Sequence, residues 1–236
     1  MRVASQSVAF GLQAWAGWLP GRDVLAAGGD IRAGGPPLPA SLRRRITPVG
    51  RKALEAAWTV LAGRPGAEPL IVLSSRHGEY ARTLGLLDSL AASGEVSPAE
   101  FSLAVHHGLA GLLSIASGNH AGHTAVAAGG ESFCCALLEA AAVLGDGTPS
   151  VLLMHFDESL PPQYAPVGGG EEPAVALALL LSPGGDAPGT FVMEFAPAGV
   201  SGRDCPAVAF ARLLEGEAAE SSACGERMIW RWRHAA

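Results

Sequence analysis

The residues with the clearest potential for chemistry lie between His123 and Gly147, in the segment HTAVAAGGESFCCALLEAAAVLGDG. The segment begins with a strand-like pattern, breaks at Gly129-Gly130 and continues with the apolar spacing of a helix. Several enzyme classes present a nucleophile on such a strand–turn–helix. Ser132, in a near match to G-x-S-x-G, and Cys134, two residues further on, are the candidate nucleophiles, whereas the tip of the turn has no reactive side chain.

Neither candidate nucleophile has all the partners that catalysis requires. A serine hydrolase of this type needs an acid and then a histidine after the serine, but His155 precedes Asp157 and His234 lies at the end of the sequence. A thiol at the first turn of a helix would have a lowered pKa. Cys134 and Cys135 lie about a turn further in, where packing against the core explains them better.

Two other groups of polar residues could bind ligands. Arg76 and His77 follow an apolar run at the carboxyl end of a predicted strand, where α/β sheets place their ligands, so these side chains are a possible anion contact. His106-His107 and His120-x-x-His123 have no obvious third ligand, and we expect no metal site. The sequence has no glycine-rich nucleotide loop, and we expect no cofactor.

Composition restricts the class of protein. The chain has 236 residues, of which 49% are hydrophobic and 16% are charged, as expected for a folded core. The net charge of -6 argues against a nucleic-acid-binding protein, although Arg43-Arg44-Arg45 is a local basic cluster. The longest apolar stretch is far shorter than the ~20 residues of a membrane span. Four cysteines without a CxxC pair and the absence of a signal peptide predict a cytoplasmic protein.

Strand-like and helix-like segments alternate along the chain. Thr47 and Ser97 are predicted helix caps, each followed by proline at the first helical position. We expect strands at 7–19, 69–75, 124–128, 150–156, 174–183 and 190–195, with an edge strand at 228–234. We expect helices at 48–62, 80–92, 105–116, 131–144 and 206–215, a short helix that begins at Pro98, and a loop at 26–40. Apolar strands joined by helices indicate an α/β sheet with helical cover.

Four segments in fixed order resemble a known family: PPLPASLRRRITPVGRKALEAA, VLSSRHGEYARTLGLLDSLAASGEVSPAEFSLAVHHGLAGLLSIASGN, TAVAAGGESFCCALLEAAAVL and VLLMHFDESLPPQYAPV. They are similar to the beta-ketoacyl synthase-like N-terminal domain family over about residues 36–183. The resemblance implies an α/β, thiolase-like fold equivalent to the N-terminal half of a ketosynthase. That fold would be a single layered domain over 1–236, with a mixed, mostly parallel sheet flanked by helices and a C-terminal extension at 184–236.

The resemblance also implies that the catalytic position is degenerate. Active ketosynthases carry a cysteine at the turn that opens the buried helix, and aligning Glu139-Ala140 with the family's downstream EA places Gly130 at that position. A glycine cannot form the thioester. Ketosynthases also draw two catalytic residues, usually histidines, from a C-terminal half for which 236 residues leave little room.

The family further implies where a partner would bind. In thiolase-like dimers the strand before the turn pairs across the two-fold axis. The corresponding residues here are Thr124, Ala125, Val126, Ala127 and Ala128. The preceding helix is apolar almost all round, so we expect it to be deeply packed. We also expect it to add apolar surface, through Leu109, Leu112, Leu113 and Ile115, to the same interface or to a shared acyl tunnel. The family commonly has S-V-H-N-A where this chain has Ala104 to Gly108, with His107 in place of asparagine.

The sequence therefore predicts a noncatalytic, chain-length-factor-like subunit that pairs with a ketosynthase in aryl polyene, polyketide or fatty-acid-type biosynthesis. Through that ketosynthase it would contact acyl carrier protein. Two alternatives remain: a small serine or thiol hydrolase using Ser132 or Cys134, and a homodimeric acyl-binding module.

Overall fold

The computed structural model describes residues 5–22, 25–29, 37–43, 46–64, 66–164, 173–185 and 189–235. Its strands are β1 (Gln6–Trp18), β2 (Ala26–Gly29), β3 (Leu70–Ser74), β4 (His123–Val126), β5 (Val151–Asp157), β6 (Val175–Pro183), β7 (Thr190–Pro197), β8 (Glu220–Cys224) and β9 (Met228–His234). Its helices are α1 (Ala40–Arg43), α2 (Pro48–Ala62), α3 (Tyr80–Ser93), α4 (Pro98–Leu103), α5 (Gly108–Ser117), α6 (Ser132–Gly145), the 3₁₀ turn η1 (Pro162–Tyr164) and α8 (Pro206–Leu214).

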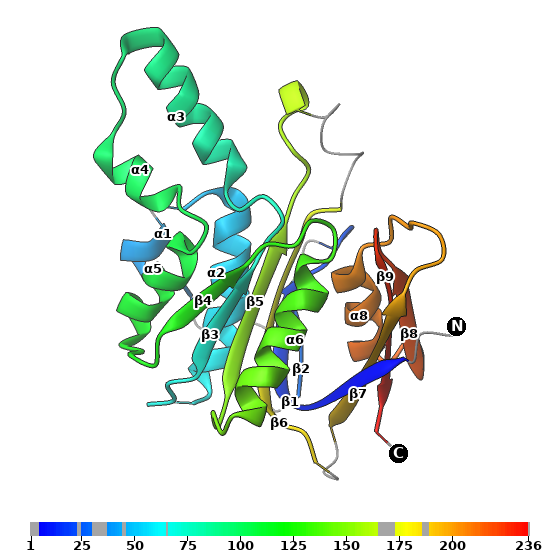
Figure 1. Cartoon of the computed structure of the whole chain (residues 1–236). Helices are drawn as coiled ribbons and strands as arrows, with labels where there is room; N and C mark the ends of the chain where they lie inside the picture. The colour runs from blue at the N-terminus through cyan, green and yellow to red at the C-terminus, as the bar shows by residue number, and fades with distance from the viewer. Residues whose placement is uncertain are drawn as a thin grey trace.

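One continuous sheet runs through the described part of the chain, in the order β4-β3-β5-β6-β1-β7-β9-β8, with β2 paired to β1 (Figure 1). The predicted α/β class and the helical cover are confirmed, but the expectation of a mostly parallel sheet is wrong. Only β3 pairs in parallel, with β4 and β5, and every other pairing is antiparallel. A run of apolar residues indicates that a strand is buried on both faces. It does not predict whether the strand pairs in parallel or antiparallel.

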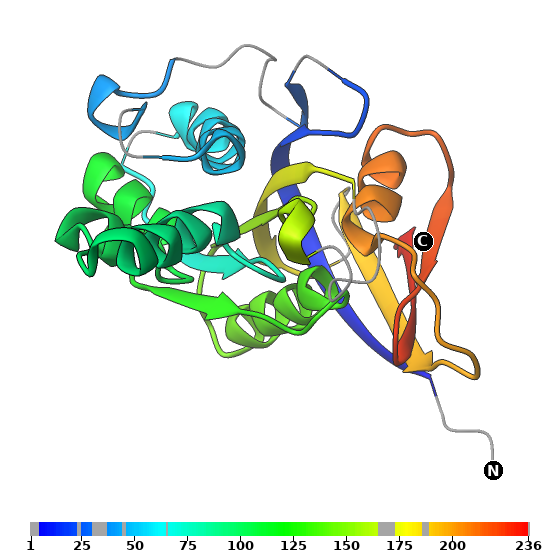
Figure 2. The ribbon, with the colours of Figure 1, turned by 90° about the horizontal axis from the view of Figure 1, so that it is seen from above.

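The sheet is buried on both faces because helices cover both. In β6, Leu177, Leu179 and Leu181 pack into a core with α6 and α8. The alternate residues Ala178 and Leu180 pack into a second core with α2 and α5. Figure 2 shows α2 and α6 on opposite sides of the sheet. The alternation explains why the β6 sequence is apolar at nearly every position.

The C-terminal segment belongs to this sheet. Strands β7, β9 and β8 continue it beyond β1, and α8 packs on them. The segment at 228–234, expected as an edge strand, is β9, which lies between β7 and β8. Strand β8 itself was not predicted, because ESSAC lacks the β-branched and aromatic residues that mark a strand.

Two helix caps predicted on the N-terminal side are confirmed. The Thr47 side chain caps α2 by accepting a hydrogen bond from Gly50 N, with Pro48 at the first helical position. Ser97 caps α4 in the same way through Glu100 N. The loop expected at 26–40 contains the short strand β2. Arg44 and Arg45 of the basic cluster lie outside the described residues.

Helices α3 and α4 form a hairpin that projects from the upper left of Figure 1, above α5 and β4. Only Arg82 is buried on α3, and α4 buries no residue. None of the helices in the described part of the chain has the length and hydrophobicity that a membrane span requires.

Candidate functional site

The turn between β4 and α6 has the sharp geometry predicted for it. Gly129 has φ +63, in the left-handed region that favours glycine, and α6 begins three residues later at Ser132. Gly130, the position that the resemblance predicts to be degenerate, lies between them. The strand–turn–helix, which we call the elbow (residues 128–132), therefore exists without a reactive side chain at its tip.

Ser132 holds the elbow together. Its hydroxyl donates to Gly129 O at 2.7 Å and accepts from Ala128 N at 2.9 Å, and the residue is 1% exposed. A nucleophile needs a hydroxyl that faces the substrate and is bonded to a general base. Both hydrogen-bonding capacities of this hydroxyl are used within the turn, so Ser132 is not placed for hydrolysis.

The neighbouring thiols are also unsuited to attack. Cys134 is fully buried, and burial, followed by the nearby Cys135 and Glu131, raises its pKa well above the usual value. Burial and Glu131 also raise the pKa of Cys135, against a smaller lowering by Arg227. A reactive thiol requires the opposite shift. Core packing of Cys134, the interpretation favoured from the sequence, agrees with this burial.

A buried carboxylate ties the elbow to the C-terminal hairpin. Glu131 is 1% exposed, and its Oε1 accepts from Met228 N at 2.7 Å and from Arg227 N at 3.0 Å. Its Oε2 accepts from Arg227 Nε at 3.2 Å. A Cβ added at Gly225 would lie 2.5 Å from Glu131 Oε1, so the turn between β8 and β9 is pressed against this carboxylate.

The same hairpin places a second carboxylate beside the tip of the elbow. A Cβ added at Gly130 would lie 3.5 Å from Glu226 Oε1, and one at Gly129 would lie 3.6 Å from Glu226 Oε2. Arg76 Nη2 lies 3.7 Å from Glu226 Oε1. The tip of the elbow is therefore next to an acidic side chain.

The predicted anion contact is positioned by a polar cluster at the carboxyl ends of β3 and β5. Asp157 Oδ1 accepts from Arg76 N at 2.8 Å and from Ser75 Oγ at 2.9 Å. The Arg76 side chain points to Glu226, as described above. His77 lines a cavity of about 330 Å³ with Glu158 and residues that follow it. Both predicted contacts thus have acidic neighbours.

The sequence did not predict that Ser74, His155 and Asp157 lie next to one another. Ser74 Oγ lies 3.1 Å from His155 Nδ1, and His155 Nε2 lies 3.5 Å from Asp157 Oδ2. Burial lowers the pKa of His155 to about 3 and raises the pKa of Asp157, the latter against hydrogen bonds from Arg76 and Ser75. Ser74 is 0% and His155 3% exposed, so these three residue types of a hydrolase meet where no substrate reaches them. Their parallel register, Ser74 opposite His155, was the available signal.

The predicted interface residues divide into two groups. Strand β4 is the terminal strand of the sheet and pairs only with β3, and Ala125 and Ala127 are exposed. Thr124, Val126 and Ala128 are half-buried. In contrast, Leu109 and Leu113 are buried against α2 and the sheet, so the expectation that they face a partner is wrong. Leu112 is half-buried, and the exposed apolar residue of α5 is Ile115, because the helix turns that position outward.

The clustered histidines occupy different surroundings. The rings of His107 and His123 stack with centroids 5.5 Å apart, which joins the turn before α5 to β4. Glu68 accepts a hydrogen bond from His120 N. In the described ranges, no three histidine, cysteine or acidic side chains come together closely enough to hold a metal ion.

Comparison with known proteins identifies similar domains and structures. The family model of the beta-ketoacyl synthase N-terminal domain matches residues 15–233. No curated protein matches the chain by sequence.

The solved structures agree on the fold. A chain from the complex of the ketosynthase ApeO with its chain length factor ApeC, from Xenorhabdus doucetiae, superposes with a TM-score of 0.81 at 22% identity, covering 96% of this chain and 100% of that one. A beta-ketoacyl synthase from Burkholderia phymatum gives 0.55 at 16% identity, over 75% of this chain and 59% of that one. The ishigamide ketosynthase/chain length factor gives 0.56 at 15% identity, over 80% and 67%.

Proposed function

Because this chain belongs to the family of beta-ketoacyl synthase N-terminal domains and has the thiolase-like ketosynthase fold, we propose that it is a noncatalytic partner subunit of a ketosynthase. The observation that supports the proposal is the elbow: its tip carries glycine, with Glu226 beside it, and the resemblance predicts that this glycine occupies the family's nucleophile position. Acyl transfer through a thioester requires a thiol or another nucleophile at that position. The chain would thus act by binding.

Strand β4 supplies an edge for that binding. Gly122 O and Val126 O accept hydrogen bonds from β3, through Ile71 N and Ser75 N. Since the hydrogen-bonding direction alternates along a strand, the N–H and C=O groups of His123 and Ala125 point away from β3. Such an unpaired edge invites another strand. We propose that the ketosynthase pairs with it, and that residues 124–128 form the centre of the interface.

The proposed biosynthetic role and cellular compartment follow from the family resemblance and from the proposed ketosynthase partner. A match to a ketosynthase in complex with its chain length factor supports a chain-length-factor-like role, in aryl polyene, polyketide or fatty-acid-type synthesis. Acyl carrier protein would reach the pair through the ketosynthase. None of the four cysteines forms a disulfide, which supports a reducing, cytoplasmic compartment.

Co-expression with the ketosynthase encoded nearest to its gene tests the proposal. We expect the two proteins to co-purify in equal amounts and the ketosynthase to lose condensing activity when this chain is omitted. Separate elution at micromolar concentration, together with a ketosynthase that is fully active alone, would sink the proposal.

A proline variant tests the edge itself. Ala125→Pro removes an outward-facing N–H while leaving the hydrogen bonds of β4 to β3 in place, so the isolated chain should fold normally. We expect pairing to weaken by at least about tenfold, which corresponds to roughly 1.4 kcal/mol. Ser222→Pro on β8, at the other end of the sheet, is the matched control and should pair as the unmodified chain does.

A further inference from the structure

Exposed apolar side chains are concentrated at one end of the molecule. Within the described ranges, the large hydrophobic residues that are exposed are Leu87, Leu90, Val96, Phe101, Val105, Ile115 and Val200. All except Val200 belong to α3, α4, α5 and the turns between them. Phe101 is 63% and Ile115 84% exposed, which is unusual for side chains of this size unless another surface covers them. We call the six residues between 87 and 115 the hairpin surface.

The hairpin surface lies next to the edge strand. Helix α5 leads directly into β4, and the stacked rings of His107 and His123 join the two. Figures 1 and 2 both place α3, α4, α5 and β4 at the same end of the molecule. A partner strand on β4 would therefore bring the rest of that partner close to the hairpin surface.

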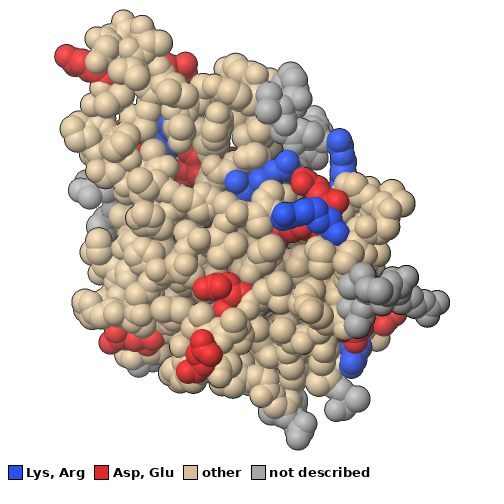
Figure 3. All heavy atoms as spheres, viewed as in Figure 1, with Lys and Arg blue, Asp and Glu red and all other residues tan. Residues whose placement is uncertain are grey.

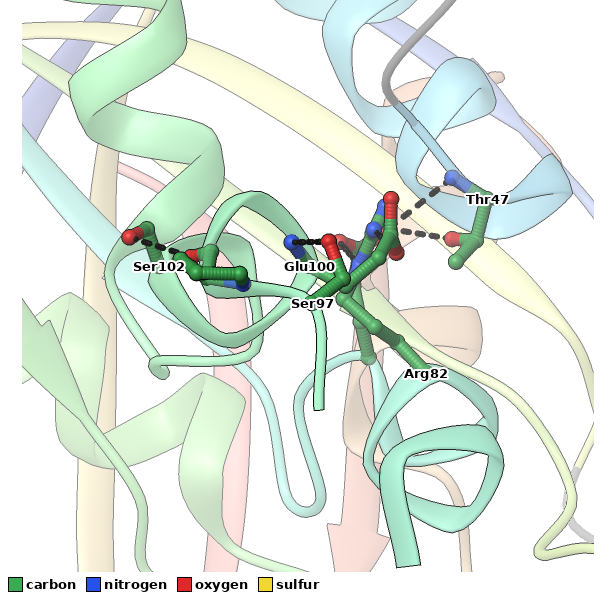
Figure 4. Close-up of polar contacts among 7 residues, drawn as sticks. Thr47, Arg82, Ser97, Glu100 and Ser102 are labelled. Carbon is green, nitrogen blue, oxygen red and sulfur yellow. Dashed lines mark hydrogen bonds and ion pairs between the residues drawn. The ribbon is translucent and has the colours of Figure 1, made fainter. Parts of the chain in front are cut away.

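The hairpin is held to the body by a network of charged side chains (Figure 4). Glu79 Oε1 accepts from Thr47 N at 3.2 Å and from the Thr47 hydroxyl, and its Oε2 lies 3.3 Å from Arg82 Nε. Arg82 also pairs with Glu100 on α4. Glu79 and Arg82 are 8% and 9% exposed, so the pair fixes both helices to the start of α2. The hairpin surface is thus presented by a fixed element.

The exposed acidic and basic side chains on α3, α4 and α5 have one sign. No lysine or arginine occurs in the sequence between Arg82 and Arg203, and Arg82 itself is buried. Asp88 and Glu95, which flank the apolar residues of α3, are both exposed. In Figure 3 the projecting hairpin is mostly tan, with acidic groups at its tip. The surface is therefore apolar with an acidic rim.

We propose that the hairpin surface is a second contact area for the ketosynthase subunit, which meets it with an apolar face bordered by lysine or arginine. This inference rests on the proposed pairing and names the side chains that give it specificity. Apolar residues buried at the centre of an interface supply most of the affinity, and rim charges of opposite sign select the partner.

A second copy of this chain fits the surface poorly. In a symmetric dimer the same patch meets itself, so the acidic rims would face each other without a cation from residues 83–202 to separate them. Like charges placed together across an interface are costly. The surface thus favours a different subunit and disfavours self-pairing.

The apolar part is tested with single charges placed in it. Phe101→Glu and Ile115→Glu should each weaken binding to the ketosynthase by about tenfold or more, as expected when a residue central to an interface is lost. Val200→Glu is the matched control, because Val200 is 79% exposed and lies outside the hairpin surface. Binding is measured by titration with the purified ketosynthase, and circular dichroism checks that each variant is folded.

The acidic rim is tested by reversing its charge. The double variant Asp88→Lys/Glu95→Lys should bind about tenfold more weakly at low salt and lose the salt dependence of the unmodified chain. Glu220→Lys on β8 is the control, and it should change neither the affinity for the ketosynthase nor the salt dependence of binding. Native mass spectrometry of the chain alone should show a monomer at micromolar concentration.

The possible results separate this inference from the proposed function. If Ala125→Pro releases the ketosynthase while the hairpin variants bind normally, the hairpin surface is not a contact and the pairing stands. A homodimer of the chain alone that Phe101→Glu disrupts would overturn the inference in favour of a second copy. If the unmodified chain binds no ketosynthase, both proposals fail.

Discussion

The elbow and the hairpin surface are close in sequence but use their side chains in opposite ways. At the elbow every polar group that could do chemistry is buried and bonded: Ser132 within the turn, and Glu131 to the C-terminal hairpin. At the hairpin surface large apolar side chains such as Phe101 and Ile115 face outward. A site for chemistry needs accessible polar groups, and a site for association needs accessible apolar area. The elbow lacks accessible polar groups, and the hairpin surface offers accessible apolar area.

The largest difference in stability between the two regions is expected from Glu131→Ala. It would leave the N–H groups of Arg227 and Met228 without their acceptor in a buried turn, at a cost of about 3 kcal/mol in the free energy of unfolding. Urea unfolding monitored by tryptophan fluorescence measures the loss. Glu131→Gln keeps one acceptor oxygen and should lose clearly less. Equal stability of Glu131→Ala and the unmodified chain would mean that the hairpin does not hold the elbow.

The buried side chain of His155 makes the stability of the folded chain sensitive to acid. His155 stays neutral in the folded chain down to a pKa of about 3, whereas the unfolded chain takes up the proton near 6.5. The unfolded state therefore binds more protons in this window, and the free energy of unfolding falls as the pH falls through it. The slope should approach about 1.4 kcal/mol per pH unit from this residue.

The contribution of His155 is isolated by comparing two proteins, the unmodified chain and a His155 variant. The quantity compared is the slope of the unfolding free energy against pH. Asp157 acts in the opposite direction, because its raised pKa favours the folded state as acid is added. The comparison is therefore made between pH 6.5 and about pH 5, ahead of most carboxyl titration. His155→Gln should show a flatter dependence of the unfolding free energy on pH. Identical slopes in the two proteins would contradict the neutral, buried histidine.

Removing the buried thiol should have a smaller effect. Cys134→Ala leaves a space of about one methyl group in the core, which costs about 1 kcal/mol. Since the thiol is a packing group, the variant should bind the ketosynthase as the unmodified chain does. Any turnover of activated esters that is lost in Cys134→Ala or Ser132→Ala would instead support a hydrolase.

The smallest effect on stability is expected at the hairpin surface. Phe101→Ser should change the free energy of unfolding by no more than about 0.5 kcal/mol, because the side chain is mostly exposed. Thermal unfolding of the isolated chain measures this. A loss similar to that of Glu131→Ala would show that Phe101 belongs to the core and that the two regions do not differ as described.

Local signals in the sequence predicted most of the elements correctly. Thr47 and Ser97 cap their helices as expected, because capping depends on neighbouring residues only. The strand at 174–183 was recognised from its apolar run. Its antiparallel pairing with β1 and β5 was not, because pairing is decided by residues far away in the chain.

The site was only partly predictable for the same reason. Gly130 at the tip of the turn followed from a family motif within one segment. The contact of Glu131 with residues almost a hundred positions later, and the approach of Glu226, depend on how the C-terminal hairpin folds back. The helix at 105–116 was expected to be packed nearly all round, yet Ile115 is exposed. An apolar composition does not distinguish a core-facing side chain from one that awaits a partner.

The most direct test of a binding role without catalysis is condensing turnover by the reconstituted pair. The chain is titrated into a fixed amount of the ketosynthase, and into the same ketosynthase with its catalytic cysteine replaced by alanine. We expect turnover to rise and saturate at one chain per ketosynthase in the first case and to stay at zero in the second. Turnover in the pair that lacks the ketosynthase cysteine, or turnover that does not change when this chain is added, would contradict that role.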